Sequence, residues 1–286
     1  MANSNASWRG AAAALMAICG LPMAAHALAN RTPHSGLTIT EALGRGRPLV
    51  VIDAGHGGRD PGALSPTTGI REKDINLLLA RAIRDALVRE GRVRVAMTRD
   101  DDRFIALPAR VALARRLRAN LFIAVHSDSA PNPLAHGATI YTLSEVASDI
   151  EAARLAVREN SRDDLESVDL GASDPGVRAI LADLTRRETM AVSADFARLL
   201  QREASGTGVT FRNQYHRFAN FRVLRAADTA AILLESGYLT NSGDTEFLAS
   251  PEGRARIAAG MARSIGTHFA RQRALQAQLS AAGPIG

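Results

Sequence analysis

The sequence contains very little cysteine, lysine or aromatic side chain. Its 286 residues include one cysteine, Cys19, and one lysine, Lys73, and aromatic residues make up 4%. A chain processed after Cys19 has no cysteine, which excludes disulfides, cysteine metal ligands and thiol nucleophiles. The scarcity of aromatic rings removes the stacking platform on which a single-strand nucleic-acid binder depends. Function must therefore come from other side chains.

Nearly all the positive charge is arginine. Of the 35 basic residues 34 are arginine, and the formal net charge is +6. These arginines are spread along expected helices with Asp and Glu between them, without the clustering typical of a nucleic-acid interface. We attribute the bias to codon composition and expect no nucleic-acid partner. The positive balance is compatible with an anionic cell wall.

The first 27 residues have the pattern of a secretory signal peptide. Arg9 precedes an apolar run over residues 11–25, and an Ala-His-Ala motif ends at Ala27. A membrane anchor is the alternative, but the run is shorter than the roughly 18 to 20 residues of a span, and Gly20 and Pro22 interrupt it. We predict cleavage after Ala27, export to the periplasm and no stable membrane insertion afterwards.

After the signal the chain divides into a linker over 28–47, a catalytic domain over 48–271 and a flexible tail over 272–286. Within the domain short apolar runs alternate with amphipathic segments, which predicts a single α/β domain with a mostly parallel twisted sheet flanked by helices. We expect strands at 49–53, 93–97, 121–125, 138–143, 221–224 and 230–235, and helices that start near residues 72 and 108 and span about 189–203 and 253–271. Residues 144–188 are rich in charge and alanine and are predicted to form a helical insertion over the active site.

Four side chains gather at one expected edge of this sheet. His56 follows the strand that ends at Asp53, His126 follows Val125, and Glu235 ends the strand AAILLE. Ligands of open parallel sheets lie beyond the carboxyl ends of the strands. Glu72 lies three residues before Ile75, on the core-facing stripe of its helix, where a bare carboxylate would be costly to bury. The four residues are therefore expected to lie close together.

Two imidazoles and a carboxylate form the His2Glu ligand set of catalytic zinc sites, which keep a position open for water. We predict that His56, Glu72 and His126 bind Zn²⁺ and that Glu235 is the general acid/base. Asp53 or Asp60 could orient a ligand imidazole. Taken singly, each histidine could be a hydrogen-bonded structural residue, Glu72 a helix-start carboxylate and Glu235 the partner of an arginine.

Several motifs resemble the zinc-dependent N-acetylmuramoyl-L-alanine amidases of the cell-separation type. They are VIDAGHGGRDPGA, REKDINL, TRDDDRFIAL, FIAVHSDSAPNP, GATIYTLSE and ILLESGYLTNSGD, in order over roughly residues 48–269. The resemblance implies cleavage of the amide between N-acetylmuramic acid and L-alanine of peptidoglycan, in wall turnover and daughter-cell separation. It assigns the zinc to His56, Glu72 and His126 and the catalytic role to Glu235. The run that follows Glu235 departs from the family's usual Glu-Thr-Ala-Phe-like pattern.

In some relatives a helical insertion covers the site, and one of its glutamates occupies the zinc until an activator with a LytM-type domain removes it. By position and length the insertion at 144–188 fits this description. The resemblance leads us to expect Glu151 as the autoinhibitory ligand, ahead of Glu145. A solvated helix residue is the competing interpretation of Glu151.

Three other functions compete with this interpretation. A metallocarboxypeptidase acting on free peptides uses similar ligands, but the HxxE spacing common in that group is missing near His56. A non-catalytic wall-binding module would be expected to lack a ligand or the carboxylate. A glycosidase with paired acids would leave the two histidines unexplained. We expect a peptidoglycan hydrolase that works as a monomer.

Overall fold

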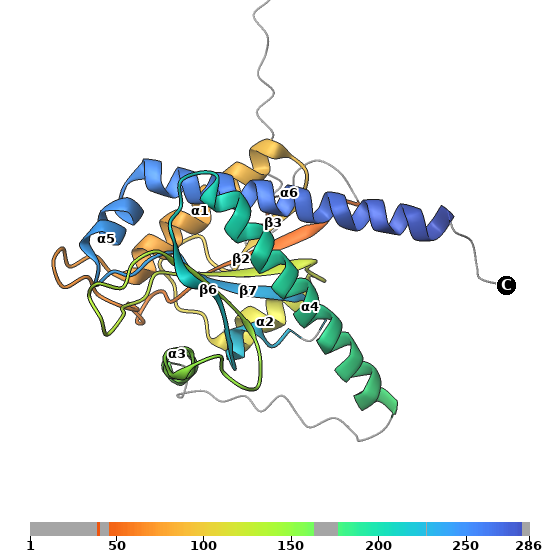
Figure 1. Cartoon of the computed structure of the whole chain (residues 1–286), viewed down its shortest axis with the longest axis horizontal. Helices are drawn as coiled ribbons and strands as arrows, with labels where there is room; N and C mark the ends of the chain where they lie inside the picture. Colours follow the sequence, from red (N-terminus) through yellow and green to blue (C-terminus); the bar gives the residue numbers. More distant parts are fainter. Residues whose placement is uncertain (1–38, 41–45, 163–176, 227, 282–286) are drawn as a thin grey trace, which may run out of the picture.

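The computed structural model describes residues 39–40, 46–162, 177–226 and 228–281 (Figure 1). The predicted signal peptide, most of the predicted linker, residues 163–176 of the predicted insertion and the last five residues lie outside this range. Two residues of the predicted linker, Ile39–Thr40, form the short strand β1, which pairs antiparallel with β3.

The core is a seven-stranded sheet in the order β1-β3-β2-β4-β7-β5-β6. Its centre is parallel and consists of β3 (Arg94–Met97), β2 (Leu49–Ala54), β4 (Leu121–His126) and β7 (Ala230–Glu235). All six residues of β2, β4 and β7 are buried, as expected for strands covered on both faces. β5 (Ala138–Leu143) runs antiparallel to β7 and parallel to the edge strand β6 (Phe211–Ala219). The predicted α/β fold is confirmed.

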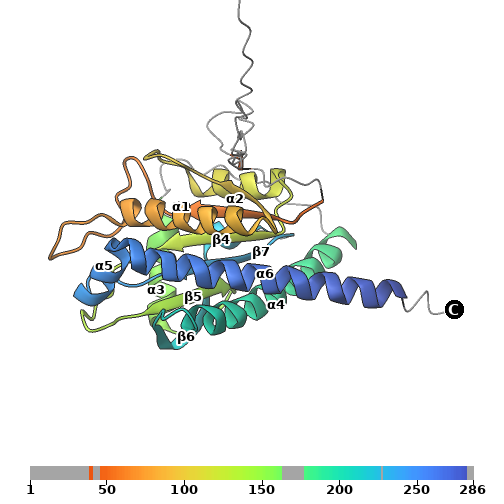
Figure 2. The same cartoon turned by 90° about the horizontal axis from the view of Figure 1, so that it is seen from above.

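Helices cover both faces of the sheet, as Figure 1 shows, and Figure 2 looks onto one of these helical layers from above. One face packs against α1 (Glu72–Glu90), α4 (Val177–Ser205) and α6 (Pro251–Ala281), and α6 contacts both of the other two helices. The other face packs against α2 (Leu107–Arg116), α3 (Ile150–Ser161) and the 3₁₀ turn η1 (Arg222–Leu224). The short helix α5 (Ser242–Ala249) precedes α6. The central strands are thus packed between two apolar layers. The loops at the carboxyl ends of these strands carry the candidate active site described below.

Four elements differ from the sequence prediction. Residues 221–224, expected as a strand, contain the 3₁₀ turn η1. The polar segment FRNQYHRFA, for which no strand is predicted, is the edge strand β6. α4 starts at Val177, twelve residues before the predicted helix. α6 continues to Ala281 through much of the predicted flexible tail, with its last turns exposed.

Within the described part of the chain, none of the helices has the length and apolar character that crossing a bilayer requires.

Candidate active site

The four predicted site residues lie at the carboxyl edge of the parallel strands. His56 follows β2, His126 ends β4, and Glu72 begins α1. Glu235 ends β7, and the register pairs it directly with His126. The central strands therefore bring together residues that are up to 179 positions apart in the sequence, 56 to 235.

Glu72 lies between the two histidines. Its Oε1 lies 2.9 Å from His56 Nε2 and 3.2 Å from His126 Nδ1. Its other oxygen, Oε2, accepts a hydrogen bond from the backbone N–H of Ala63 at 2.8 Å, and the side chain is fully buried. Ser127 N and Asn76 Nδ2 donate to Oε1. The carboxylate thus has a fixed orientation between the two imidazoles.

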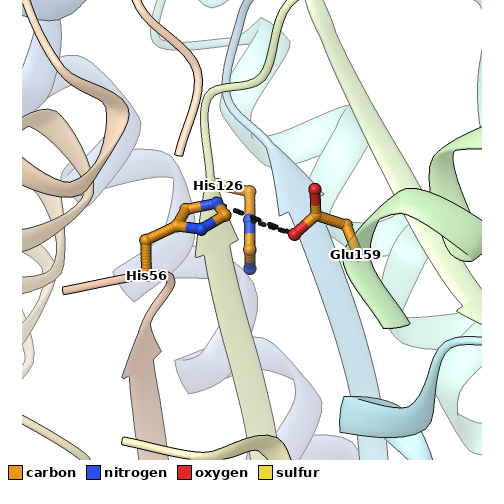
Figure 3. Close-up of side chains that lie close together, drawn as sticks. All are labelled: His56, His126 and Glu159. Atoms are coloured by element: carbon orange, nitrogen blue, oxygen red, sulfur yellow. Dashed lines mark ion pairs between the residues drawn. The ribbon is translucent and has the colours of Figure 1, made fainter. Parts of the chain in front are cut away.

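A second carboxylate reaches the same point from α3. Figure 3 shows Glu159 on α3 pointing toward both imidazole rings. Its Oε2 lies 3.7 Å from His56 Nε2 and 3.8 Å from His126 Nδ1. One ligand atom from each of His56, His126 and Glu159 lies within 4.8 Å of the others. All three side chains are buried, so the cluster is closed from solvent.

The donor set fits a bound cation. His56 Nδ1 lies 2.7 Å from Asp60 Oδ2, so a neutral imidazole donates there and turns the lone pair of Nε2 toward the carboxylates of Glu72 and Glu159. Nε2 has no hydrogen-bond partner among the described residues. A lone pair facing two buried carboxylates is repulsive unless a proton or a metal ion lies between them. Imidazole nitrogen and carboxylate oxygen are ligands that Zn²⁺ prefers.

Without a metal, a proton would be drawn to the same place. Burial lowers the pKa of His56, but the charges of Glu72 and Glu159 and the hydrogen bond to Asp60 outweigh it and raise the pKa to about 10. The site therefore attracts positive charge strongly.

Two glycines allow the backbone to pass close to His126 and Glu72. A Cβ at Gly55 would lie 2.5 Å from the His126 ring, and one at Gly62 would lie 2.6 Å from Glu72 Oε2. His56 has φ of 61°, which is uncommon for a residue other than glycine, and Arg110 donates to its carbonyl at 2.8 Å. Substituting either glycine would therefore move a predicted ligand.

Glu235 lies fully buried beside this cluster. Its Oε2 accepts the backbone N–H of Asp128 at 2.9 Å, while Oε1 has no hydrogen-bond partner among the described residues. Burial, together with the negative charges of Asp128 and Glu72, raises the pKa of Glu235 well above its usual range. Burial and the charge of Glu72 also raise the pKa of Asp128, to about 7. A carboxyl group that keeps its proton near neutral pH is suited to general acid/base catalysis.

Comparison with known proteins places this chain in a family. Residues 50–267 match the family model described as N-acetylmuramoyl-L-alanine amidase. The chain belongs to this amidase family. It is 35% identical to the amidase AmiC of Neisseria meningitidis over 80% of this chain and 56% of that protein. It is 31% identical to AmiA of Escherichia coli over 78% of this chain and 77% of that protein.

Solved structures of the amidase family share the fold. AmiC2 of Nostoc punctiforme is 28% identical and superimposes with a TM-score of 0.56, covering 79% of this chain and 99% of that one. The catalytic domain of CwlV from Paenibacillus polymyxa is 26% identical with the same TM-score of 0.56, over 78% and 98%. The chain spans little more than half the length of the first two curated relatives, 56% and 54%.

In this structure the glutamate of α3 that lies against the two histidines is Glu159, whereas Glu151, the residue expected there, lies elsewhere. Glu151 binds Arg212 and Arg217 on β6, with oxygen to nitrogen distances of 2.6 and 2.7 Å. Eight residues separate the two glutamates, which is about 12 Å along a helix. Glu145, the second choice, is exposed and pairs with Arg186.

Charged contacts hold α3 in this position. Arg158 pairs with Asp128, the neighbour of Glu235. Arg162, just past the end of α3, pairs with Asp60 at 2.9 Å and lies 3.3 Å from Glu159. Ala152, Leu155 and Ala156 are buried against the sheet. The helix thus contacts residues on both sides of the cluster formed by His56, His126 and Glu159.

The structure also separates the other candidates. Asp60 contacts His56, whereas Asp53 pairs with Arg110 at 2.7 Å and accepts from Thr98, so only Asp60 can orient a ligand imidazole. Away from this site, His216 lies on β6 and is 3.0 Å from Thr142 Oγ1.

Sequence reasoning missed Glu159 and Asp128. Glu159 continues the buried stripe of Ala152, Leu155 and Ala156 at helical spacing, a pattern that also singled out Glu72. Asp128 lies two residues past His126, and its only signal is its place in the loop after β4.

Proposed function

We propose that this chain is a zinc-dependent hydrolase that cuts the amide between N-acetylmuramic acid and L-alanine in peptidoglycan. The observation that carries the proposal is the convergence of His56 Nε2, His126 Nδ1 and the Glu72 carboxylate beside the buried Glu235. Membership of the amidase family supports the substrate. The place of action we propose is the periplasm, in wall turnover and daughter-cell separation.

His56, Glu72 and His126 would hold the zinc ion. When bound, the ion supplies Lewis-acid polarisation of the scissile carbonyl and lowers the pKa of a water molecule toward ~7. The hydrogen bond between Asp60 and His56 Nδ1 keeps Nε2 free as a ligand. The hydrogen bond from Ala63 orients the Glu72 carboxylate in the same way.

Glu235 would move the proton. As a carboxylate it accepts a proton from the attacking water, and as an acid it gives a proton to the leaving nitrogen of L-alanine. Its raised pKa, caused first by burial and then by Asp128, favours the second step near neutral pH. The Asp128 N–H to Oε2 hydrogen bond fixes the side chain while Oε1 remains without a partner among the described residues.

In the conformation described here the site would be inhibited. Glu159 lies where a fourth ligand or substrate would bind, and α3 buries the cluster. We propose Glu159, in place of Glu151, as the autoinhibitory ligand. An activator with a LytM-type domain would then act by moving α3, since Arg158, Glu159 and Arg162 are all carried by that segment or lie next to it.

Mass analysis of products from purified sacculi tests the reaction. We expect fragments that end in a free L-alanine amine and sugar chains that keep an intact lactyl group. In the Glu159→Gln background, which frees the metal position, activity should stop with a chelator and return with zinc, and adding Glu235→Gln should lower it about 10²- to 10⁴-fold. Glu246→Gln, on the exposed side of α5, is the matched control and should have no effect.

Two results would contradict this function. Cleavage of free peptides that lack sugar, with sacculi left intact, would indicate a carboxypeptidase. Activity that is indifferent to chelator, in protein holding less than about half a zinc per chain, would remove the metal from the reaction.

A further inference from the structure

A second charged cluster lies at the other end of α3. Arg212 and Arg217 of β6 both contact the carboxylate of Glu151, at 2.6 Å to Oε1 and 2.7 Å to Oε2. Arg217 also lies 3.5 Å from Asp149, the N-cap residue of α3. The Arg217 side chain is only 7% exposed, and its Nε has no hydrogen-bond partner in the described chain. Two guanidinium groups thus share carboxylates that belong to α3.

An irregular strand places both arginines on one carboxylate. Ala138 and Ile140 of β5 pair with Phe211 and His216 of β6, so a two-residue step on one strand matches a five-residue step on the other. Such a bulge redirects side chains that regular alternation would separate. The bulge is therefore part of how the two arginines come together.

This cluster adjoins the proposed reaction centre. Arg212 and Glu151 line a pocket of about 380 Å³ together with Asp128 and Tyr238. Asp128 donates its N–H to Glu235, and Arg212 donates to the Tyr238 hydroxyl at 3.1 Å. The pocket thus connects the arginines to the catalytic side of the site.

Movement of α3 would leave these arginines in need of an anion. Both carboxylates that contact them, Glu151 and Asp149, are on or next to α3 and would leave with it. Arg212 would keep the Tyr238 hydroxyl, and Arg217 would keep the amide oxygen of Gln214 at 3.4 Å. Two neighbouring guanidinium groups that lose their carboxylate partners attract another anion, so the open site favours a carboxylate from a ligand.

We propose that Arg212, supported by Arg217, binds a substrate carboxylate and that Glu151 occupies this position in the closed state. The inference rests on the proposed function, because it takes the substrate to be a peptidoglycan stem peptide. In such a peptide a D-glutamate that follows L-alanine is linked through its γ-carboxyl, which leaves its α-carboxylate free one residue beyond the scissile amide. α3 would then block both the metal and the neighbouring peptide subsite.

Two soluble substrates that differ at this one group test the proposal. They are N-acetylmuramoyl tripeptides whose second residue carries either an α-carboxylate or an α-carboxamide. The parent enzyme is the Glu159→Gln variant, in which the metal position is freed. We expect its kcat/KM to be on the order of tenfold or more higher for the carboxylate, as a charged hydrogen bond allows.

Substitution of Arg212 should remove this preference. In the parent background, Arg212→Met should bring the kcat/KM ratio of the two substrates close to one through KM, while Arg212→Lys should keep part of the preference. Arg198→Met, on the exposed side of α4, is the matched control and should keep all of it. Because Arg212→Met could also disturb folding, Glu151→Gln provides an independent variant. It should raise kcat/KM more for the carboxylate substrate than for the carboxamide.

The outcomes separate the two proposals. Equal kcat/KM values for both substrates in the parent, or a preference that survives Arg212→Met, would overturn the carboxylate subsite and leave the amidase function intact. A zinc-loaded parent that hydrolyses neither substrate nor purified sacculi would overturn the amidase function and the subsite with it.

Discussion

The two ends of α3 each place a glutamate at the sheet edge, but in opposite electrostatic surroundings. Glu151, near the start of the helix, is 36% exposed and lies against two arginines. Glu159, near its end, is 6% exposed and has one oxygen facing two imidazole nitrogens and the Glu72 carboxylate. The first glutamate already has its fixed cations. The second has Arg162 at 3.3 Å and Arg158 at 3.9 Å from its Oε1, but its Oε2, which faces the imidazoles, lacks a fixed cation among the described residues.

This contrast indicates what each contact blocks. A carboxylate that faces a set of metal ligands competes for the metal, whereas one that faces guanidinium groups competes for their anionic ligand. Under the proposed function, the same helix would therefore block two different parts of one substrate. Variants at its two ends should have separable effects.

The largest effect is expected at the metal end. Glu159→Gln replaces a carboxylate with a neutral, weaker ligand and should raise basal release of wall fragments about 10- to 100-fold, which corresponds to about 1.4 to 2.7 kcal/mol. The measurement is dye release from labelled sacculi without any activator, at equal zinc content. Glu145→Gln, on the exposed loop before α3, is the control. A rate that stays at the wild-type level would show that Glu159 does not block the metal.

A smaller effect is expected at the arginine end. Glu151→Gln frees Arg212 and Arg217 but leaves Glu159 in place, so basal release should rise only about 3- to 10-fold, within the range of a partly exposed ion pair. The same sacculus assay measures it. If the increase equals or exceeds that of Glu159→Gln, the two ends do not differ in the way described.

Substituting the N-cap residue at the start of α3 should have a modest effect on the contacts at both ends of the helix. Asp149 accepts a hydrogen bond from Ala152 N, and its loss in Asp149→Ala should destabilise the first turn of α3 by about 1 kcal/mol. Amide hydrogen exchange across α3 should become faster in that variant. Asp149→Asn keeps a capping oxygen and should exchange at nearly the wild-type rate. Equal acceleration in both would mean that the charge toward Arg217, and not the cap, is what matters.

The smallest effect concerns pH. Burial tends to raise the pKa of Glu151, but hydrogen bonds from Arg212 and Arg217 outweigh it and lower the pKa. A carboxyl with a lowered pKa stabilises the folded state above its unfolded pKa, and this stability is lost as the pH falls through the folded value. The docking of α3 should therefore weaken under acidic conditions. Amide hydrogen exchange of α3, measured at acidic pH for wild type and Glu151→Gln, isolates the contribution of the Glu151 carboxylate to docking. The variant should lack this pH dependence.

Much of the site could be predicted because it follows from strand ends and helical stripes. Buried runs that end at Asp53, Val125 and Glu235 are visible in the sequence, and parallel strands bring such ends together. Glu72 was found because it continues the apolar stripe of α1. The same reasoning applied to α3 would have favoured Glu159, since Glu151 lies off the buried stripe of Ala152, Leu155 and Ala156.

The parts that could not be predicted depend on tertiary context. β6 has polar residues without alternation, and it forms a strand because it pairs with β5 at the edge of the sheet. The bulge that brings Arg212 and Arg217 together has no sequence signal. The sequence also does not specify the position of α3 along the sheet edge. This position decides which turn of the helix lies against the histidines.

The most direct test of this account is the location of the metal in the zinc-loaded wild-type protein. Anomalous diffraction at the zinc edge should give one peak within bonding distance, about 2.0 to 2.2 Å, of His56 Nε2, His126 Nδ1, Glu72 and Glu159. A peak elsewhere, or one at the histidines with Glu159 turned away and α3 still docked, would contradict the proposal that α3 inhibits the enzyme by placing Glu159 on the zinc ion.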